Sequence, residues 1–126
     1  MERKIRVLIT DDHILMREGL THILSQEPDL EVVAEARDGV EAVELATVFQ
    51  PDVILMDISM PNMNGIEATR IIHRSSPEIK IIGLSMFAAD ECATDMRSAG
   101  AVDYISKSDS RNLLLKAIRD SMSPIP

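Results

Sequence analysis

Five polar residues whose side chains could together support phosphoryl chemistry each follow an apolar stretch of the sequence. They are Asp11, Asp12, Asp57, Ser85 and Lys107. If the three carboxylates meet, they repel one another, by about 4 kcal/mol for a pair at about 4 Å and an effective dielectric constant near 20. Mg²⁺ is the natural countercharge, because it prefers hard oxygen ligands and usually keeps waters and phosphate oxygens around it. An aspartate beside such a cation can attack phosphorus and form an acyl phosphate, with an ammonium and a hydroxyl binding the phosphoryl oxygens.

The elements that carry these residues decide whether their side chains meet. Stretches rich in Ile and Val alternate with segments of helical period, which is typical of a parallel sheet built from strand-helix-strand units. We expect strands over residues 5–10, 31–36, 52–57, 79–85 and 102–107. We expect helices over residues 12–27, 39–49, 64–76, 90–98 and 110–122, with Ser110 as the N-cap of the last.

The order of the strands follows in part from their polarity. Residues 52–57 (DVILMD) hold four consecutive apolar residues, as expected of a central strand covered on both faces, whereas 31–36 (EVVAEA) is more polar and fits an edge. In doubly wound sheets the ligand site lies beyond the carboxyl ends of the strands. All five candidate residues lie at such ends, so the sequence predicts that they converge on one crevice.

Each candidate also has a simpler interpretation when it is taken alone. Asp11 and Asp12 could start the first helix, one as its N-cap and the other favouring its positive end. Asp57 could be a turn residue ahead of Pro61, and Ser or Lys at the end of a strand is unremarkable. The coincidence of all five at strand ends favours the functional interpretation.

Composition limits the class of protein. The 126 residues are 45% hydrophobic and 27% charged, which suits one globular domain. A formal net charge of −8 argues against direct contact with nucleic acid by this chain. The apolar runs are too short to span a bilayer and the single cysteine, Cys92, cannot form an internal disulfide, so we expect a cytoplasmic protein.

The chain resembles the receiver domains of two-component response regulators over nearly its whole length, and four sequence motifs carry the resemblance. They are ITDDH, ILMDISMPNMNGIEA, IIGLS and AGAVDYISK. The resemblance implies that Asp57 is the phosphoacceptor. It also implies that Asp12, Asp57 and the main-chain carbonyl of Ser59 ligate Mg²⁺, with Asp11 acting through water.

The same resemblance implies a switch. Ser85 and Lys107 would bind the phosphoryl group, the Ser85 hydroxyl would move toward it, and Tyr104 would turn inward behind it. A phosphoryl group adds up to about two negative charges and three acceptors, enough to rearrange a loop close in energy to a second state. The helix after Ser85 suits this role because its apolar face is small, comprising Cys92, Ala93, Met96 and Ala99.

Two features bear on the subgroup. Many receivers have a proline after the lysine, whereas here Ser108 follows Lys107. With DDHILMREGL near the start, this resembles receivers that precede a LuxR-type helix-turn-helix domain. Ser59, Met86 and Phe87 flank the site at positions that vary in the family, so the lifetime of a phosphorylated state stays open.

The predicted fold is therefore a single doubly wound, flavodoxin-like α/β domain with five parallel strands in order 2-1-3-4-5 and five helices. We expect a receiver domain over residues 1–122, and a tail or the start of a linker to an output domain over 123–126. The predicted function is a signalling switch that accepts a phosphoryl group on Asp57 from a sensor histidine kinase, with Mg²⁺ as its cofactor. It would control a C-terminal DNA-binding domain in transcription regulation. The chain would catalyse only its own phosphorylation and dephosphorylation.

Other classes fit less well. A stand-alone receiver acting through protein contacts remains an alternative. A phosphohydrolase with an aspartate nucleophile needs Asp-x-Asp after its first strand, which Asp11-Asp12-His13 does not supply. A flavodoxin-like cofactor carrier needs a hydroxyl-rich phosphate loop there, and a GTPase needs GxxxxGKS/T.

The remaining residues are assigned no role in this interpretation. His13, His22 and His73 show no metal-ligand spacing, and Cys92 is expected to be a small core residue. The last helix carries a wide apolar surface from Leu113 to Met122. Either it is a broad core face, or it forms a homodimer or interdomain contact.

Overall fold

The structure is a computed structural model that describes residues 3–58, 63–85 and 91–122, without the side chains of Glu91 and Cys92. Strands and helices alternate along the chain. The strands are β1 (Ile5–Thr10), β2 (Leu30–Ala36), β3 (Val53–Asp57), β4 (Lys80–Ser85) and β5 (Asp103–Ser106). The helices are α1 (Ile14–Ser25), α2 (Gly39–Phe49), α3 (Gly65–Ser75), α4 (Glu91–Ala99) and α5 (Arg111–Ser121).

The five strands form one parallel sheet in the order β2-β1-β3-β4-β5, as predicted. β3 lies at its centre and every one of its residues is buried, because helices cover both faces. β2 lies at an edge, as its polar residues predicted. The strand order reverses between β1 and β3, which places the switch point of the sheet beside the ends of those two strands.

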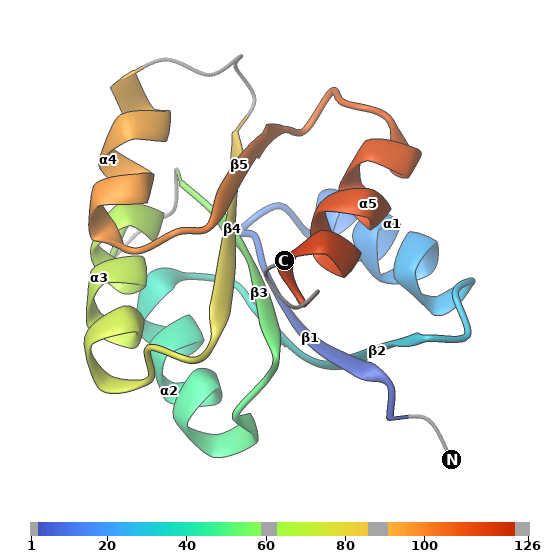
Figure 1. Ribbon diagram of the computed structural model, residues 1–126, viewed down its shortest axis with the longest axis horizontal. Helices are drawn as coiled ribbons and strands as arrows, with labels where there is room; N and C mark the ends of the chain where they lie inside the picture. Colours follow the sequence, from blue (N-terminus) through green and yellow to red (C-terminus); the bar gives the residue numbers. More distant parts are fainter. Residues whose placement is uncertain (1–2, 59–62, 86–90, 123–126) are drawn as a thin grey trace.

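Two helical layers enclose the sheet. Figure 1 shows α2, α3 and α4 on one face and α1 and α5 on the other. Each layer has its own core: Leu8, Ile54 and Met96 lie in the first, and Ile9, Leu55 and Ile118 lie in the second. Alternate residues of β1 and β3 thus point to opposite cores, as the two-residue period of a strand requires.

Local sequence signals mark the starts of α2, α3 and α5. The side chains of Asp38, Asn64 and Ser110 accept hydrogen bonds from the main-chain N–H three residues later, at 2.8, 2.9 and 3.2 Å, so each is an N-cap. The prediction for Ser110 is confirmed. α4 is followed by Gly100, whose φ of +123° lies in a region that favours glycine.

The predicted start of the first helix was wrong. α1 begins at Ile14 rather than at Asp12, and its N-cap position is taken by His13, whose side chain makes no capping hydrogen bond. Asp11 and Asp12 therefore do not cap this helix. Their side chains interact elsewhere, as described below.

The broad apolar surface of α5 is mostly a core face. Leu114, Leu115, Ala117 and Ile118 are buried, while Leu113 remains 43% exposed. Within the described residues no helix has both the length and the apolar character needed to cross a bilayer.

Candidate functional site

Asp11 directly follows β1 and is a fully buried carboxylate. Its two oxygens face different partners: Oδ2 lies 2.8 Å from Lys107 Nζ, and Oδ1 accepts a hydrogen bond of 2.9 Å from the main-chain N–H of His13. The Asp11 main-chain carbonyl accepts a 2.8 Å bond from Arg17. Backbone and side-chain contacts together therefore fix this carboxylate.

Asp57 ends β3 on the neighbouring strand and is only 3% exposed. Its Oδ2 lies 3.2 Å from Lys107 Nζ. The first residue of α3, Gly65, packs against it: a Cβ at position 65 would lie 2.1 Å from the Asp57 carbonyl oxygen, so a side chain cannot be placed there without a backbone shift. The close approach of Gly65 therefore restricts the backbone around Asp57.

Lys107 follows β5 and brings a positive charge to both carboxylates. Its side chain is 4% exposed, and its main-chain N–H donates a 2.6 Å hydrogen bond to the Ser85 carbonyl. Burial lowers the pKa of Lys107, but the hydrogen bond to Asp11 and the charge of Asp57 outweigh it and raise the pKa above 10.5. The ammonium is therefore charged at neutral pH.

The same contacts act on Asp11 in the opposite direction. Burial raises the pKa of its carboxyl, but the hydrogen bonds from Lys107 and the His13 main chain and the Lys107 charge hold it below 3.8. Asp11 is therefore ionised at neutral pH.

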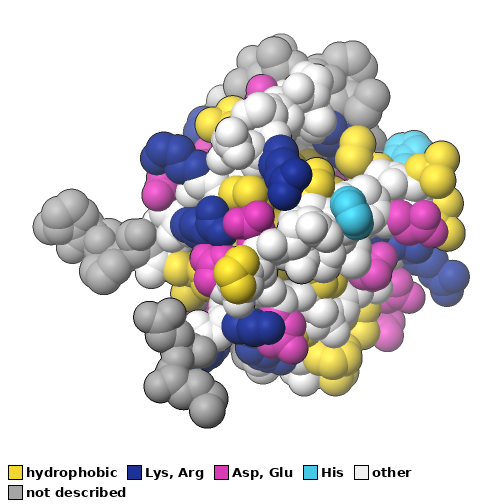
Figure 2. All heavy atoms as spheres, turned by 90° about the vertical axis from the view of Figure 1, so that its right-hand side faces the viewer, with side chains coloured by type: hydrophobic (Ala, Val, Ile, Leu, Met, Phe, Trp, Pro, Cys, Tyr) yellow, Lys and Arg dark blue, Asp and Glu magenta, His cyan; other side chains and the backbone are white. Residues whose placement is uncertain are grey.

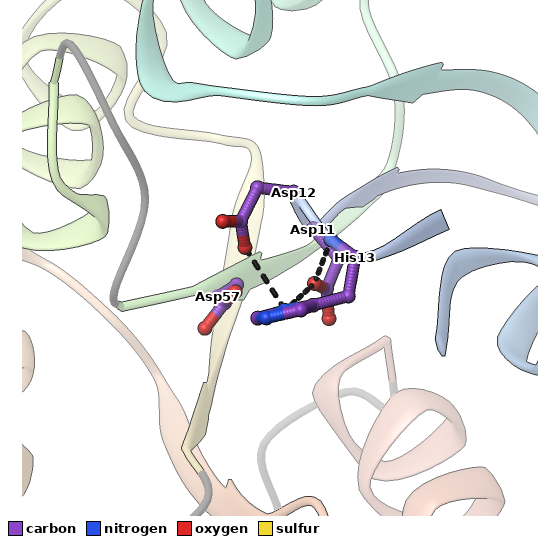
Figure 3. A group of neighbouring side chains, drawn as sticks. All are labelled: Asp11, Asp12, His13 and Asp57. Atoms are coloured by element: carbon purple, nitrogen blue, oxygen red, sulfur yellow. Dashed lines mark hydrogen bonds and ion pairs between the residues drawn. The ribbon is translucent and has the colours of Figure 1, made fainter. Parts of the chain in front are cut away.

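Asp12 and His13 complete the group at the mouth of the site. The Asp12 side chain is 28% exposed and the His13 side chain 66% exposed. Figure 3 shows the His13 ring lying between Asp11 and Asp12, and its Nδ1 is 3.2 Å from Asp11 Oδ1 and 3.1 Å from Asp12 Oδ1. The sequence assigned His13 no role because the histidines show no metal-ligand spacing, yet the structure places its ring beside these two acids. Its position directly after two acids at a strand end was the available signal.

The donor set fits a divalent cation. One ligand atom each from Asp11, Asp12, His13 and Asp57 lie within 4.8 Å of one another. Among the described residues of the site, three carboxylates and one ammonium leave an excess of negative charge. Carboxylate oxygens are the ligands that Mg²⁺ prefers.

Ser85 and Tyr104 lie on the two strands beyond β3. Ser85 ends β4, is nearly buried and pairs in register with Ser106 of β5. Tyr104 is 7% exposed and stands opposite Gly83 in the register of β4 and β5. A Cβ at Gly83 would lie 2.9 Å from both Tyr104 Cδ1 and Met96 Cε, so the tyrosine ring and α4 share the space over this glycine.

Several predictions concern residues outside the described part of the chain. The main-chain carbonyl of Ser59, predicted as a cation ligand, is one of them, as are Met86 and Phe87. The side chain of Cys92 is another. The structure does place Asp11, Asp12, Asp57, Ser85 and Lys107 at the same edge of the sheet, at the carboxyl ends of its strands.

Comparison with known proteins identifies the family. The sequence profile of the response regulator receiver domain matches residues 7–119. The transcriptional regulatory protein DegU of Brevibacillus brevis is 44% identical over 118 residues, which cover 94% of this chain and 50% of that protein. The chain thus spans about half the length of this curated relative.

Solved structures agree. The response regulator domain of Thermotoga maritima CheB superposes with a TM-score of 0.91 at 40% identity, covering 98% of this chain and all of that one. The CheX–CheY–BeF3–Mg²⁺ complex of Borrelia burgdorferi gives a TM-score of 0.90 at 27% identity, covering 97% of this chain and 92% of that one. This chain belongs to the response regulator receiver domain family of two-component signalling.

Proposed function

We propose that this domain is a Mg²⁺-dependent phosphorylation switch whose acceptor is Asp57. The observation that carries the proposal is the buried ammonium of Lys107 between Asp57 and Asp11, at 3.2 and 2.8 Å, beside a group of carboxylates close enough to share a cation. If Lys107 and its two buried aspartates formed only a structural ion pair, no third carboxylate would be needed beside them. The additional charge of Asp12 is explained by a cation site.

The cation would be held by Asp12, Asp57 and the main-chain carbonyl of Ser59, with Asp11 acting through a water molecule. When bound, Mg²⁺ supplies positive charge against the carboxylates and the phosphoryl oxygens. Asp11 is ionised and fixed by its contacts with Lys107 and the His13 main chain, so it keeps its place in the site without reorganisation.

In the reaction itself, an Asp57 oxygen attacks the phosphorus of a phosphohistidine. A P–O bond forms and the P–N bond to the imidazole of the donor breaks, and the electron pair of that bond leaves with the imidazole. Lys107 binds the phosphoryl oxygens as a charged donor, and the Ser85 hydroxyl donates to another of them. The transferred group ends as an acyl phosphate on Asp57.

The signal would pass from Ser85 to α4. The Ser85 hydroxyl moves toward the phosphoryl group and Tyr104 fills the space behind it. In the structure Tyr104 is buried over Gly83 beside Met96, a core residue of α4 that also accepts a hydrogen bond at 3.8 Å from Thr69 of α3. A shift of the tyrosine ring must therefore disturb the contact with α4.

The proposed partners are those that the family and the length of its relatives suggest. A sensor histidine kinase would donate the phosphoryl group in the cytoplasm. Residues 1–122 would form the receiver domain, and a DNA-binding output domain would follow residues 123–126, as the half-length match to a transcriptional regulator suggests. The net charge of −8 leaves nucleic acid contact to that second domain.

One face offers a surface for a protein partner or a second copy of the chain. Figure 2 shows this face, which carries α1 and α5, with hydrophobic side chains lying among charged ones. Ile14 and Leu15 are 59% and 79% exposed, and a largely apolar groove of about 390 Å³ lies between the two helices. This surface, rather than the mostly buried α5 alone, suits the predicted protein contact.

The decisive experiment uses a small phosphodonor. Incubation with acetyl phosphate and Mg²⁺ is expected to increase the mass by one phosphoryl group, and hydroxylamine should remove it. Asp57→Asn should abolish the adduct, while Asp52→Asn, just before the opposite end of β3, should leave it unchanged. An undiminished adduct on Asp57→Asn would refute the assignment, and repeated turnover of many phosphate esters would favour a phosphohydrolase.

A further inference from the structure

His13 immediately precedes α1, but its side chain does not cap the helix. It stands at the N-cap position of α1 with extended dihedral angles, φ −93° and ψ 111°, yet its side chain makes no capping hydrogen bond. The ring instead turns back toward the strand it follows, with Nδ1 near one oxygen of each acid. The acids, and not the helix, therefore determine where this ring lies.

The Asp11 carboxylate divides the site into two sides. Lys107 contacts its Oδ2, whereas the His13 ring and main chain face its Oδ1. The ammonium thus already occupies the side shared with Asp57 Oδ2. The exposed acid, Asp12, lies beside the His13 ring, so a cation held by Asp12 would lie close to that ring.

An imidazole alters the chemistry of such a site. Carboxylates alone suit Mg²⁺, whereas an imidazole nitrogen suits Co²⁺, Ni²⁺ and Zn²⁺, whose affinities also exceed those of earlier divalent ions at mixed nitrogen and oxygen sites. The His13 ring is 66% exposed, so it is free to turn one nitrogen toward an ion. Its nitrogen already lies within 4.8 Å of the three carboxylate ligand atoms.

We propose that His13 is a specificity-determining ligand of this cation site, and that it gives the chain affinity for divalent transition-metal ions that the carboxylates alone would not provide. The inference rests on the proposed function, because it concerns the same site. Mg²⁺ would use the oxygen donors with the ring turned aside, and a transition-metal ion would add the ring nitrogen. A competing account is that the ring N–H merely bridges the two acids in place of a cation.

The test measures Mg²⁺ and Co²⁺ affinity by calorimetry at constant ionic strength and pH, on the whole chain. His13→Ala and His13→Asn should each weaken Co²⁺ binding by about tenfold or more, in the range seen when groups around a metal site are removed. Mg²⁺ binding should change by less than about threefold, because Mg²⁺ prefers oxygen ligands. His22→Ala and His73→Ala are matched controls, since neither histidine lies in the group, and neither should change either affinity.

A second measurement reads the ligand directly. Proton NMR with Co²⁺ should shift the ring signals of His13 strongly, leave those of His22 and His73 near their metal-free positions, and lose this pattern in Asp12→Asn. Equal loss of Co²⁺ and Mg²⁺ affinity in the His13 variants would overturn the inference. So would tighter Mg²⁺ binding with unchanged Co²⁺ binding, which the bridging account predicts.

Failure of the inference and failure of the proposed function are distinguishable. If the wild type binds Mg²⁺ and accepts a phosphoryl group while Co²⁺ binding is insensitive to His13, only the inference falls. If the wild type neither binds Mg²⁺ nor forms the adduct, the proposed function falls, and the inference that rests on it falls too.

Discussion

Two clusters of charged residues in this molecule are built from similar side chains. The first is the group of carboxylates at the carboxyl ends of β1 and β3. The second is the set of ion pairs that connects α5 to the segment before β2. In the second group, Arg119 of α5 lies 2.7 Å from Glu27 and 2.8 Å from Asp29, and Arg111 lies 3.7 Å from Glu27. These two acids and two arginines are balanced, and the side chains of Arg119 and Asp29 are 40% and 46% exposed.

The first group differs in both respects. Its one ammonium and two of its three carboxylates are almost fully buried, and the charges do not balance. A balanced, exposed cluster joins two elements at low cost in desolvation, whereas a buried excess of like charge opposes folding. Charge balance and burial, rather than the presence of acidic residues, therefore distinguish the two clusters.

Removing the buried ammonium should have the largest effect on stability. Lys107→Met should lower the free energy of unfolding by about 3 kcal/mol in EDTA at neutral pH, because it leaves Asp11 and Asp57 buried without their cation. Urea unfolding measures the change. Lys116→Met, which removes an exposed pair with Asp120, is the matched control and should show no measurable loss. Equal effects of the two variants would contradict the contrast.

Mg²⁺ should stabilise the folded protein by binding at the first cluster, whose charges do not balance, and not at the second. At about ten times the dissociation constant, an ion that binds the native state alone adds about 1.4 kcal/mol. Thermal unfolding in MgCl₂ against NaCl of equal ionic strength should show a rise of a few degrees, and EDTA should reverse it. Arg119→Met should keep this increment and Asp12→Asn should lose it. A similar increment in both variants would place the ion elsewhere.

Much of this arrangement could be predicted from the sequence. The buried character of β3 follows from its apolar run, and the cap at Ser110 follows from local chemistry. The convergence of Asp11, Asp57 and Lys107 follows from a single topological rule for doubly wound sheets. Such features depend on periodicity and local hydrogen bonding, which a sequence displays directly.

The start of α1 and the place of His13 could not be predicted in the same way. Local rules favour Asp11 and Asp12 as helix caps, but Asp11 is engaged by Lys107, a residue from the opposite end of the chain. This tertiary contact removes the acid from the helix and leaves His13 at the cap position. The spacing of the three histidines in the sequence does not indicate that the His13 ring turns back toward β1, the strand it follows.

Neutralising one acid in each cluster should change stability in opposite directions. Asp12→Asn should raise the free energy of unfolding in EDTA by about 1 kcal/mol, because it relieves repulsion among crowded carboxylates that Lys107 does not offset. Asp29→Asn should lower it by up to about 1 kcal/mol, because it breaks the contact with Arg119. Parallel denaturation curves at one pH provide the measurement. A loss of stability in both variants would show that the excess charge is not what distinguishes the site.

The smallest expected effect concerns acid. The hydrogen bond from Arg119 outweighs slight burial and lowers the pKa of Asp29 below 3.8, so the native state binds fewer protons than the unfolded chain near that pH. The contribution of Asp29 is therefore present above pH 3.8 and is lost as the pH falls through the lower native value. Wild type should lose more stability than Asp29→Asn over that interval, by about 0.5 kcal/mol or less because the pair is exposed. High salt should shrink the difference further, since exposed charges are screened. Salt should have a much smaller effect on the contribution of the buried pair of Lys107 and Asp11 to stability at low pH. If salt changed the contributions of the two clusters by similar amounts, burial would not be what distinguishes them.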